Sequence, residues 1–578
     1  MTSRKSDLTC TADRVFRNAK VYSVSLDDTV TRAEAVAVKD GKIVYVGTND
    51  GVQAYVGDTT EITECQGNTL LPGFGDGHMH LGVSSKRYAG VIFIDLREID
   101  PQEGEYYAKE MQKRLRSYAD AHPDAKAILG FGWDRGWFDG SQGFPVRPIT
   151  REDLDAAVPD KPVILDSFCG HVCLFNSKAL EEAGLLHTGV EQIDGGIIRI
   201  GKDGVPDGYV AEMAAIYAVK ALTPSSAETK EGLHAGLSAA LADFARQGLT
   251  LASDYLHVQS SYETIAQMAR DGELTLRMSG SFTIYDNTAD EDLAYAVEHM
   301  HTYDVDDLVK ADAAKFFVDG NPATFTPYTE QSIRNNGYPE GFCGELLWDE
   351  EHLNTAAAAA QKAGFNLHAH AMGDRGVAVA AAAFSAARSR EDPEKKARNV
   401  IIHITLATDE SKRIMAESGM IANLQPLWAA ATENNSVGEY ENFGKAREKE
   451  FYPFQSIIDT GVTVAFGSDF PVEPCDIFGG IQSAITRLPA PTNVQYKVSK
   501  NDPLVNPAER ISFQNAIKGY TINTAYELGL ETVTGSIEVG KSAELVLIDR
   551  DLEATPVDQI YSTKVLETVF KGKTVYKA

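Results

Sequence analysis

Eight short apolar segments, mostly separated by helical patterns, constrain the fold of this chain more than any other feature. Each has the length of one buried strand, and the stretches between them, such as GLHAGLSAALADFARQ, have the apolar spacing of amphipathic helices. Strands that alternate with helices form a parallel sheet, and eight such units close into a barrel. The sequence therefore predicts an α/β protein with a TIM-like (β/α)8 barrel, whose strands lie within residues 71–82, 248–255, 275–285, 313–320, 365–374, 397–404, 419–426 and 463–471.

The two ends of the chain have a different pattern. Residues 1–70 and 532–578 contain short runs of alternating apolar and polar residues, with a hairpin signal at Asp40-Gly41. Neither end has enough strands for a stable sheet of its own. We predict that both ends together form one small β-sandwich domain, and that residues 71–531 form the barrel.

One interval of the predicted barrel is too long for a single connection between a strand and a helix. It follows the first barrel strand and covers about residues 83–222, with its own strand-like pieces AILGFGW and PVILDSF and its own helical run. We predict that this interval is an insertion on the active-site side of the barrel.

The acidity of the chain narrows the classes of partner. Its 578 residues include 54 Lys and Arg and 83 Asp and Glu, which gives a formal net charge of −29 at pH 7. Such a surface repels nucleic acids and anionic lipids, so we expect neither nucleic acid nor membrane as a partner. The expected partners are a small-molecule substrate and a second copy of the chain in a homodimer. The N-terminus lacks the apolar core of a signal peptide, and six cysteines make no disulfide framework in so long a chain, so we expect a reduced, cytoplasmic protein.

Metal-ligating residue types stand at the ends of several predicted strands. In barrels of this kind the reactive side chains gather at the carboxyl ends of the strands. His78 and His80 lie two residues apart, so both point to the same face of the first strand. Several imidazole and carboxylate ligands at one rim are the donors that zinc prefers. The residues at these predicted strand ends are His78, His80, Lys315, Asp319, His368, His370, His403 and Asp469.

Together these motifs resemble the amidohydrolase superfamily. The stretches LPGFGDGHMHLG, KFFVDG, HAMGDRG, FGSDFPVEP and GSIEVGKSAELVLID look like its YtcJ-like branch, which includes N-substituted formamide deformylases, and the similarity runs from about residue 13 to the C-terminus. The resemblance implies a zinc-dependent hydrolase of C–N bonds. It implies that His78, His80 and Asp469 bind a first metal ion and that His370 and His403 bind a second.

The resemblance also gives roles to Lys315 and Asp469. Lys315 falls where many relatives carry a lysine that CO2 has carboxylated and that bridges two metal ions. The alternative is an ion pair of Lys315 with Asp319 or another acid, and a single metal ion. Asp469 would take a proton from the attacking water and pass it to the leaving amine, and its alternative role is a capping aspartate. Ile402 stands where relatives often have a glutamate, so a partner of His403 is missing.

The insertion and the aromatic residues supply the remaining candidates. His171 lies in CGHVCLFNSKAL and would bind a substrate carbonyl or its oxyanion, with a buried structural histidine as the alternative. Cys169 and Cys173 flank it, but a structural zinc would lack its fourth ligand. His368 is predicted to be a supporting or core residue, and Asp254 and Arg375 to form ion pairs or caps. The predicted substrate-binding aromatic residues are Trp133 and Trp428, with Trp137 and Phe138 as further pocket walls.

We therefore predict a metal-dependent amidohydrolase that cleaves a non-peptide amide, with an N-substituted formamide as a candidate substrate and with one or two zinc ions. Hydrolysis of a cyclic amide, a carbamate or an ester at the same site is the alternative among enzymes. A non-catalytic metal-binding regulatory or scaffold protein is the alternative from another class, although such a protein would be expected to lose at least one ligand.

Overall fold

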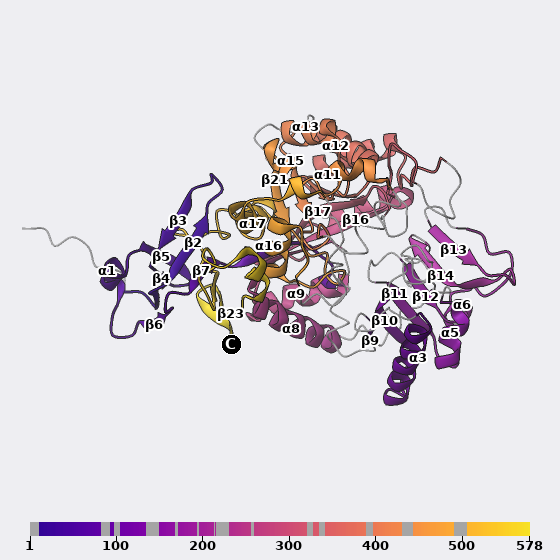
Figure 1. The fold of residues 1–578 in the computed structure, drawn as a ribbon, viewed down its shortest axis with the longest axis horizontal. Helices are drawn as coiled ribbons and strands as arrows, with labels where there is room; N and C mark the ends of the chain where they lie inside the picture. The colour runs from indigo at the N-terminus through magenta and orange to yellow at the C-terminus, as the bar shows by residue number, and fades with distance from the viewer. Residues whose placement is uncertain are drawn as a thin grey trace, which may run out of the picture.

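The computed structural model shows a central barrel with a β domain at one end and the insertion at the other (Figure 1). It describes residues 11–82, 93–96, 104–125, 127–133, 149–167, 172–192, 196–212, 214, 230–255, 259–320, 327–333, 341–388, 397–430, 443–490 and 506–578.

The barrel contains eight parallel strands that follow one another in chain order, and this confirms the predicted (β/α)8 fold. The first and last strands lie side by side, because the backbone N–H of Asp469 donates to the carbonyl of His78 at 2.8 Å. The strands are β8 (Phe74–Met79), β15 (Leu249–Asp254), β16 (Arg277–Ile284), β17 (Val309–Phe317), β18 (Asn366–Ala371), β19 (Val400–His403), β20 (Ile421–Leu424) and β21 (Thr463–Phe466).

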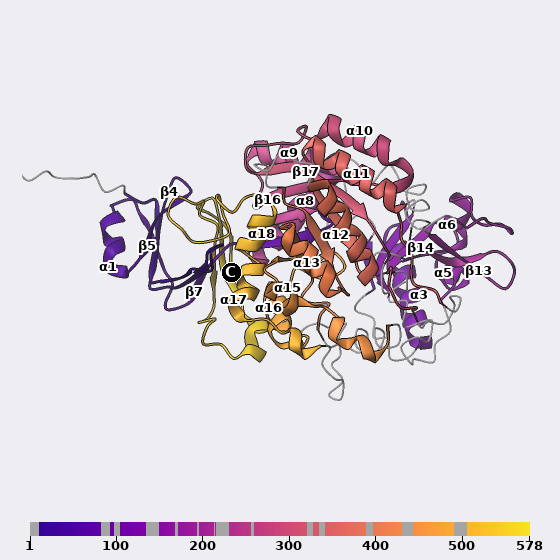
Figure 2. The same cartoon turned by 90° about the horizontal axis from the view of Figure 1, so that it is seen from above.

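Helices surround these strands (Figure 2). The alanine-rich helix α11 has clear end signals, because Asp349 caps its first turn and Gly364, with a φ of 106°, ends it in the left-handed conformation. Its small side chains allow close packing against the next helix. The main barrel helices are α8 (Lys230–Gln247), α9 (Gln259–Asp271), α10 (Ala289–His299), α11 (Glu350–Ala363), α12 (Asp374–Arg388), α13 (Asp409–Glu417), α15 (Phe454–Asp459), α16 (Ile477–Thr486), α17 (Phe513–Gly519) and α18 (Ile522–Glu527). Among the described residues, no helix combines the length and the apolar character needed to span a bilayer.

Both ends of the chain build the β domain as two sheets packed face to face. Apolar side chains from both sheets, such as Phe16, Leu70 and Leu545, share one buried core. The Asp40-Gly41 hairpin forms as predicted, with positive φ at both residues. One sheet has the order β5 (Lys42–Gly47), β4 (Ala35–Lys39), β1 (Arg14–Arg17), β6 (Glu61–Glu64), and the other β24 (Lys573–Lys577), β23 (Val565–Phe570), β22 (Leu545–Ile548), β7 (Thr69–Pro72), β2 (Lys20–Val24), β3 (Val30–Ala33).

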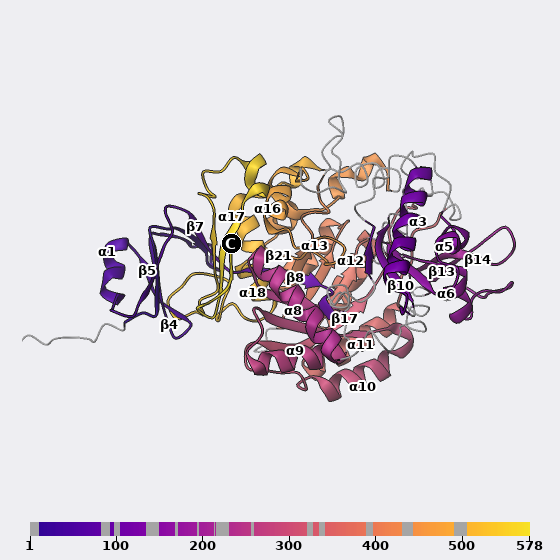
Figure 3. The same ribbon diagram turned by 90° about the horizontal axis from the view of Figure 1, so that it is seen from below.

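The insertion follows β8 and forms its own sheet and core, on the side of the barrel away from the β domain (Figure 3). The strand-like pieces predicted from the sequence become β10 and β11. The sheet order is β13 (Gly196–Ile200), β14 (Pro206–Glu212), β12 (Val172–Phe175), β11 (Val163–Ser167), β10 (Ile128–Trp133), β9 (Phe93–Asp95), and the helices are α3 (Gly104–Ala121), α5 (Arg151–Ala157) and α6 (Ser177–Glu182). The domain boundaries at residues 70, 83, 222 and 532 stay a prediction.

Candidate metal centre

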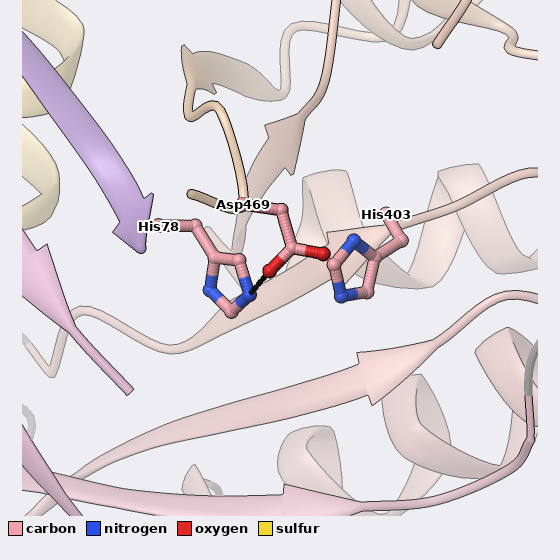
Figure 4. Close-up of side chains that lie close together, drawn as sticks. All are labelled: His78, His403 and Asp469. Carbon is pink, nitrogen blue, oxygen red and sulfur yellow. Dashed lines mark ion pairs between the residues drawn. The ribbon is translucent and has the colours of Figure 1, made fainter. Parts of the chain in front are cut away.

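Three of the predicted ligands meet at one rim of the barrel. His78, His403 and Asp469 are buried, and each offers one ligand atom within 4.8 Å of the others (Figure 4). They come from the ends of β8 and β19 and from the loop after β21. Parallel strands of a barrel end at the same rim, so residues far apart in the sequence come together there.

Asp469 is the centre of this cluster. Its Oδ1 lies 3.0 Å from Nε2 of His78 and 2.8 Å from Nε2 of His80. Burial alone would raise the pKa of Asp469, but the His78 and His80 imidazoles in contact with its carboxylate outweigh burial and hold the pKa well below its ordinary value. Asp469 is therefore a carboxylate at neutral pH, with two imidazoles aimed at the same oxygen.

The backbone is strained at two of these ligands. His403 has a φ of 79° and Asp469 a φ of 58°, in the left-handed region that non-glycine residues rarely adopt. Such conformations cost about 1–3 kcal/mol each and cluster at functional sites. The closure of the barrel also needs Gly467 here, because a Cβ at this residue would lie 2.6 Å from the backbone nitrogen of His78.

Lys315 and His370 extend the cluster along β17 and β18. The imidazole of His370 lies 4.6 Å from that of His403, centroid to centroid. Lys315 is fully buried, and its Nζ has no hydrogen-bond partner among the described residues. Its Nζ lies 4.9 Å from the ring centroid of Tyr255 and 5.1 Å from that of Phe317. Burial lowers the pKa of Lys315 to about 7.

The alternative ion pair between Lys315 and Asp319 does not form. Asp319 instead accepts backbone N–H groups of Tyr328, Met372 and Gly373 at 3.0, 2.9 and 2.8 Å. Asp319 therefore anchors the HAMGD loop after β18 to the end of β17. This leaves Lys315 with no buried carboxylate as a hydrogen-bond partner.

Three of the buried histidines, His78, His368 and His403, are neutral at physiological pH. Burial lowers the pKa of His78 well below its ordinary value and that of His403 to about 3. His368 faces the ring of Tyr255 at 4.9 Å, and burial lowers its pKa to about 3 as well. Neutral imidazole is the form that binds metal ions. The donor set thus fits a divalent metal, with convergent nitrogen and carboxylate atoms and an acidic counter-charge.

A glutamine, rather than the residue before His403, supplies the polar partner of this histidine. Nδ1 of His403 lies 2.9 Å from Oε1 of Gln425, whereas Ile402 packs into a small apolar cluster with Tyr255 and neighbouring strands. Trp428 stacks on the His403 ring with centroids 5.1 Å apart and an interplanar angle of 8°. Trp428 therefore lies beside the candidate metal centre, as a pocket wall would.

Other predicted residues lie away from this cluster or outside the described residues. The indole of Trp133 is 1% exposed in the core of the insertion and donates to the carbonyl of Leu165 at 2.8 Å, so its role is packing rather than substrate contact. Asp254 accepts the N–H of Gly82, and Arg375 lies over the ring of Tyr328, so both are structural. The described residues do not include His171, Cys169, Trp137 or Phe138.

Sequence reasoning missed two acidic residues near the ligands. Asp76 is buried and accepts the N–H of His78 and the N–H and hydroxyl of Ser468, which links β8 to the loop of Asp469. Burial raises its pKa to about 6. Glu527, on α18, is also buried, and burial raises its pKa to about 8 against the hydrogen bonds of Asn423 and Tyr255. Asp76 could have been found from the sequence, because it is the acidic residue of the GDGHMH motif. No local motif marks Glu527.

A (β/α)8 barrel that collects buried histidines, a lysine and an aspartate at its strand ends is the architecture of a metal-dependent hydrolase. The chain belongs to the amidohydrolase family, whose model matches residues 61–576.

Individual relatives agree with this assignment. The chain is 27% identical to the putative amidohydrolase YtcJ of Bacillus subtilis, over 94% of this chain and 96% of that protein. It is 25% identical to an N-substituted formamide deformylase of Arthrobacter pascens, over 98% of both chains. A crystal structure of an uncharacterized metal-dependent hydrolase from Pyrococcus horikoshii has a TM-score of 0.71 at 20% identity, over 94% of this chain and 99% of that one, and so shares the fold.

Proposed function

We propose that this protein hydrolyses the amide C–N bond of a small molecule, with an N-substituted formamide as the favoured substrate class and zinc as the metal. The observation that carries the proposal is the convergence of His78 and His80 on one oxygen of Asp469. The formamide is favoured because a relative that covers 98% of this chain is named for that reaction.

Zinc fits the donor set because imidazole nitrogen and carboxylate oxygen are its usual ligands in catalytic sites. His78, His80 and Asp469 would hold one ion, and His370 and His403 a second. When bound, such an ion lowers the pKa of a water molecule and polarises the substrate carbonyl.

Asp469 would move the proton in this reaction. Its low pKa keeps the carboxylate ionised, so it can accept a proton from the attacking water. The protonated carboxyl would then give that proton to the amine nitrogen as the C–N bond breaks, which turns a poor leaving group into a neutral amine. Formate and a primary amine are the products expected from an N-substituted formamide.

Lys315 would carry a carboxyl group derived from CO2 and bridge two ions. Its support is the full burial of the side chain, the absence of a hydrogen-bond partner for Nζ among the described residues, and the position of His370 on the next strand, two residues beyond His368, which pairs with Lys315. Trp428 would form one wall of the substrate pocket, and His171 would donate to the substrate oxygen.

The test measures metal content and amine release together. Protein stripped with a chelator should be inactive, and Zn2+ should restore the hydrolysis of N-substituted formamides, measured as amine produced. Cyclic amides, a carbamate and an ester serve as the comparison panel. Full activity without stoichiometric metal would overturn the metal-dependent mechanism, and tight Zn2+ binding with no turnover on any class would favour the scaffold protein.

A further inference from the structure

Buried polar side chains link His403 to a helix that follows the barrel. Gln425 Oε1 lies 2.9 Å from His403 Nδ1, and Gln425 Nε2 donates to Oδ1 of Asn423 at 3.0 Å. Asn423 Nδ2 in turn donates to both carboxylate oxygens of Glu527, at 3.1 and 2.9 Å. Gln425 and Asn423 lie at the end of β20, and Glu527 is the last residue of α18. The path therefore runs from the metal centre into the interior of the protein.

The carboxylate at the far end gives this path a direction. Asn423 Nδ2 donates to both oxygens of Glu527, and above the Glu527 pKa of about 8 the ionised carboxylate can only accept, so Asn423 must turn its NH2 group toward Glu527 and its oxygen toward Gln425. Gln425 must then turn its own NH2 group toward Asn423 and its oxygen toward His403. An amide oxygen also only accepts, so Nδ1 of His403 must carry the proton. Nε2 of His403 is left with the lone pair that a metal ion needs.

The sequence motif around His78 leaves room for this path. A Cβ at Gly77 would lie 2.4 Å from Nδ2 of Asn423 and 2.5 Å from Oε2 of Glu527. Both distances are far below a normal contact, so any other residue would push the two side chains apart. The glycine before the first metal ligand therefore leaves room for the hydrogen bond between Asn423 and Glu527.

We propose that Glu527 is a positioning residue that, through Asn423 and Gln425, fixes the tautomer and orientation of His403 for metal binding. The inference rests on the proposed metal site. Partners of this kind behind a metal-bound histidine typically contribute 10–100-fold to metal affinity.

A second contact of Glu527 must be separated from this path. Tyr255 donates to Oε1 of Glu527 at 3.0 Å, and its ring lies 4.3 Å from the ring of His78. A loss of metal affinity on changing Glu527 could therefore pass through Tyr255 instead. A double-mutant cycle with Gln425 distinguishes the two routes, because only one of them contains Gln425.

The experiment measures Zn2+ affinity of the metal-free full-length protein by competition with a chromogenic chelator at pH 8.5, where Glu527, with a pKa of about 8, is mostly ionised. Glu527→Gln and Gln425→Leu should each weaken Zn2+ binding by roughly 10–100-fold. The double variant should be no weaker than Gln425→Leu alone. Gln425→Glu should stay within about 3-fold of wild type, because a carboxylate keeps the acceptor for His403 Nδ1.

Asn399→Leu is the matched control. Asn399 is also a fully buried asparagine with hydrogen bonds to two elements, but it lies at the start of β19, away from His403. This variant should lose thermal stability and keep wild-type Zn2+ affinity. If Glu527→Gln does not fold, Asn423→Leu takes its place in the cycle.

Each outcome decides one question. Wild-type protein that fails to bind Zn2+ would refute the proposed metal site itself. If the wild-type protein binds Zn2+, two results would overturn the positioning role. One is an unchanged Zn2+ affinity in Gln425→Leu. The other is a double variant in which the effects of Glu527→Gln and Gln425→Leu on Zn2+ affinity add. Weakened binding that does not add, with Asn399→Leu at wild-type affinity, supports it.

Discussion

Asp469 is the residue on which the proposed chemistry depends most. Asp469→Asn keeps the shape of the side chain and one oxygen for a metal ion but cannot carry a proton. Positioned acid–base catalysis contributes about 10²–10⁴-fold, so kcat for amine release should fall by at least about 10²-fold while much of the metal remains. Metal content measured on the same sample is the control. A rate within a few-fold of wild type at full metal content would require a different base.

Lys315 gives a pH dependence whose sign can be worked out. Burial lowers its pKa to about 7, so the amine becomes neutral as pH rises through 7, and only a neutral amine reacts with CO2. With bicarbonate present, the number of Zn2+ ions bound per chain should therefore increase between pH 6 and pH 8. Lys315→Met should hold a single ion at both pH values, measured by elemental analysis after dialysis. Two ions in that variant would contradict the bridging carbamate.

Loops at the ends of the strands are held by their own hydrogen bonds, and Asp319 is the clearest case. It is 1% exposed and accepts three backbone N–H groups from the segments that follow β17 and β18. Asp319→Leu leaves these donors unsatisfied, at about 1–3 kcal/mol each, so the free energy of unfolding in urea should fall by at least about 2 kcal/mol. Asp409→Asn, at a fully exposed carboxylate, is the control and should stay within about 0.5 kcal/mol. A stable Asp319→Leu protein would show that the loop holds without this carboxylate.

At the level of elements, the barrel could be predicted because its signals are local. Each strand is a short apolar run, and the residue types that bind metals follow the runs directly, so the rule that strand ends share one rim brings His78, His403 and Asp469 together. The segment RVFRNAKVYSV shows the limit of this reasoning. It reads as one run, but the chain turns at Asn18, with a φ of 53°, so β1 and β2 join different sheets.

The supporting residues of the site could not be predicted in the same way. Asn423 and Glu527 are 104 positions apart, and neither has a neighbour in sequence that marks it as part of a metal centre. The role of Trp133 could not be decided from the sequence for a related reason, because an aromatic residue in a glycine-rich stretch fits a pocket wall and a packed core equally well. Burial, which decides between these roles, depends on the tertiary arrangement.

In the whole molecule, the barrel lies between two additional units (Figure 1). The insertion follows the strand of His78, while the β domain packs at the other end of the barrel (Figure 1). That the insertion forms one wall of the substrate pocket stays a proposal, as do the homodimer and the cytoplasmic location. The β domain is connected directly to the start of the first barrel strand, because a single residue separates β7 from β8.

Contact between the barrel and the β domain includes a buried ion pair. Arg277 on β16 is 1% exposed, and its Nη2 lies 3.2 Å from Oε1 of Glu544, just before β22. In Glu544→Ala, the guanidinium of Arg277 stays buried. Among the described residues its remaining charged partner is then Asp307, whose side chain is 42% exposed. Breaking one half of such a pair costs about 3–5 kcal/mol, whereas replacing both halves by apolar residues is often neutral. We therefore expect Glu544→Ala to lower the free energy of unfolding in urea by several kcal/mol and the double variant Arg277→Met, Glu544→Leu to recover most of it. If the double variant were instead as unstable as Glu544→Ala, the junction would depend on the charges themselves rather than on filling the space between the two units.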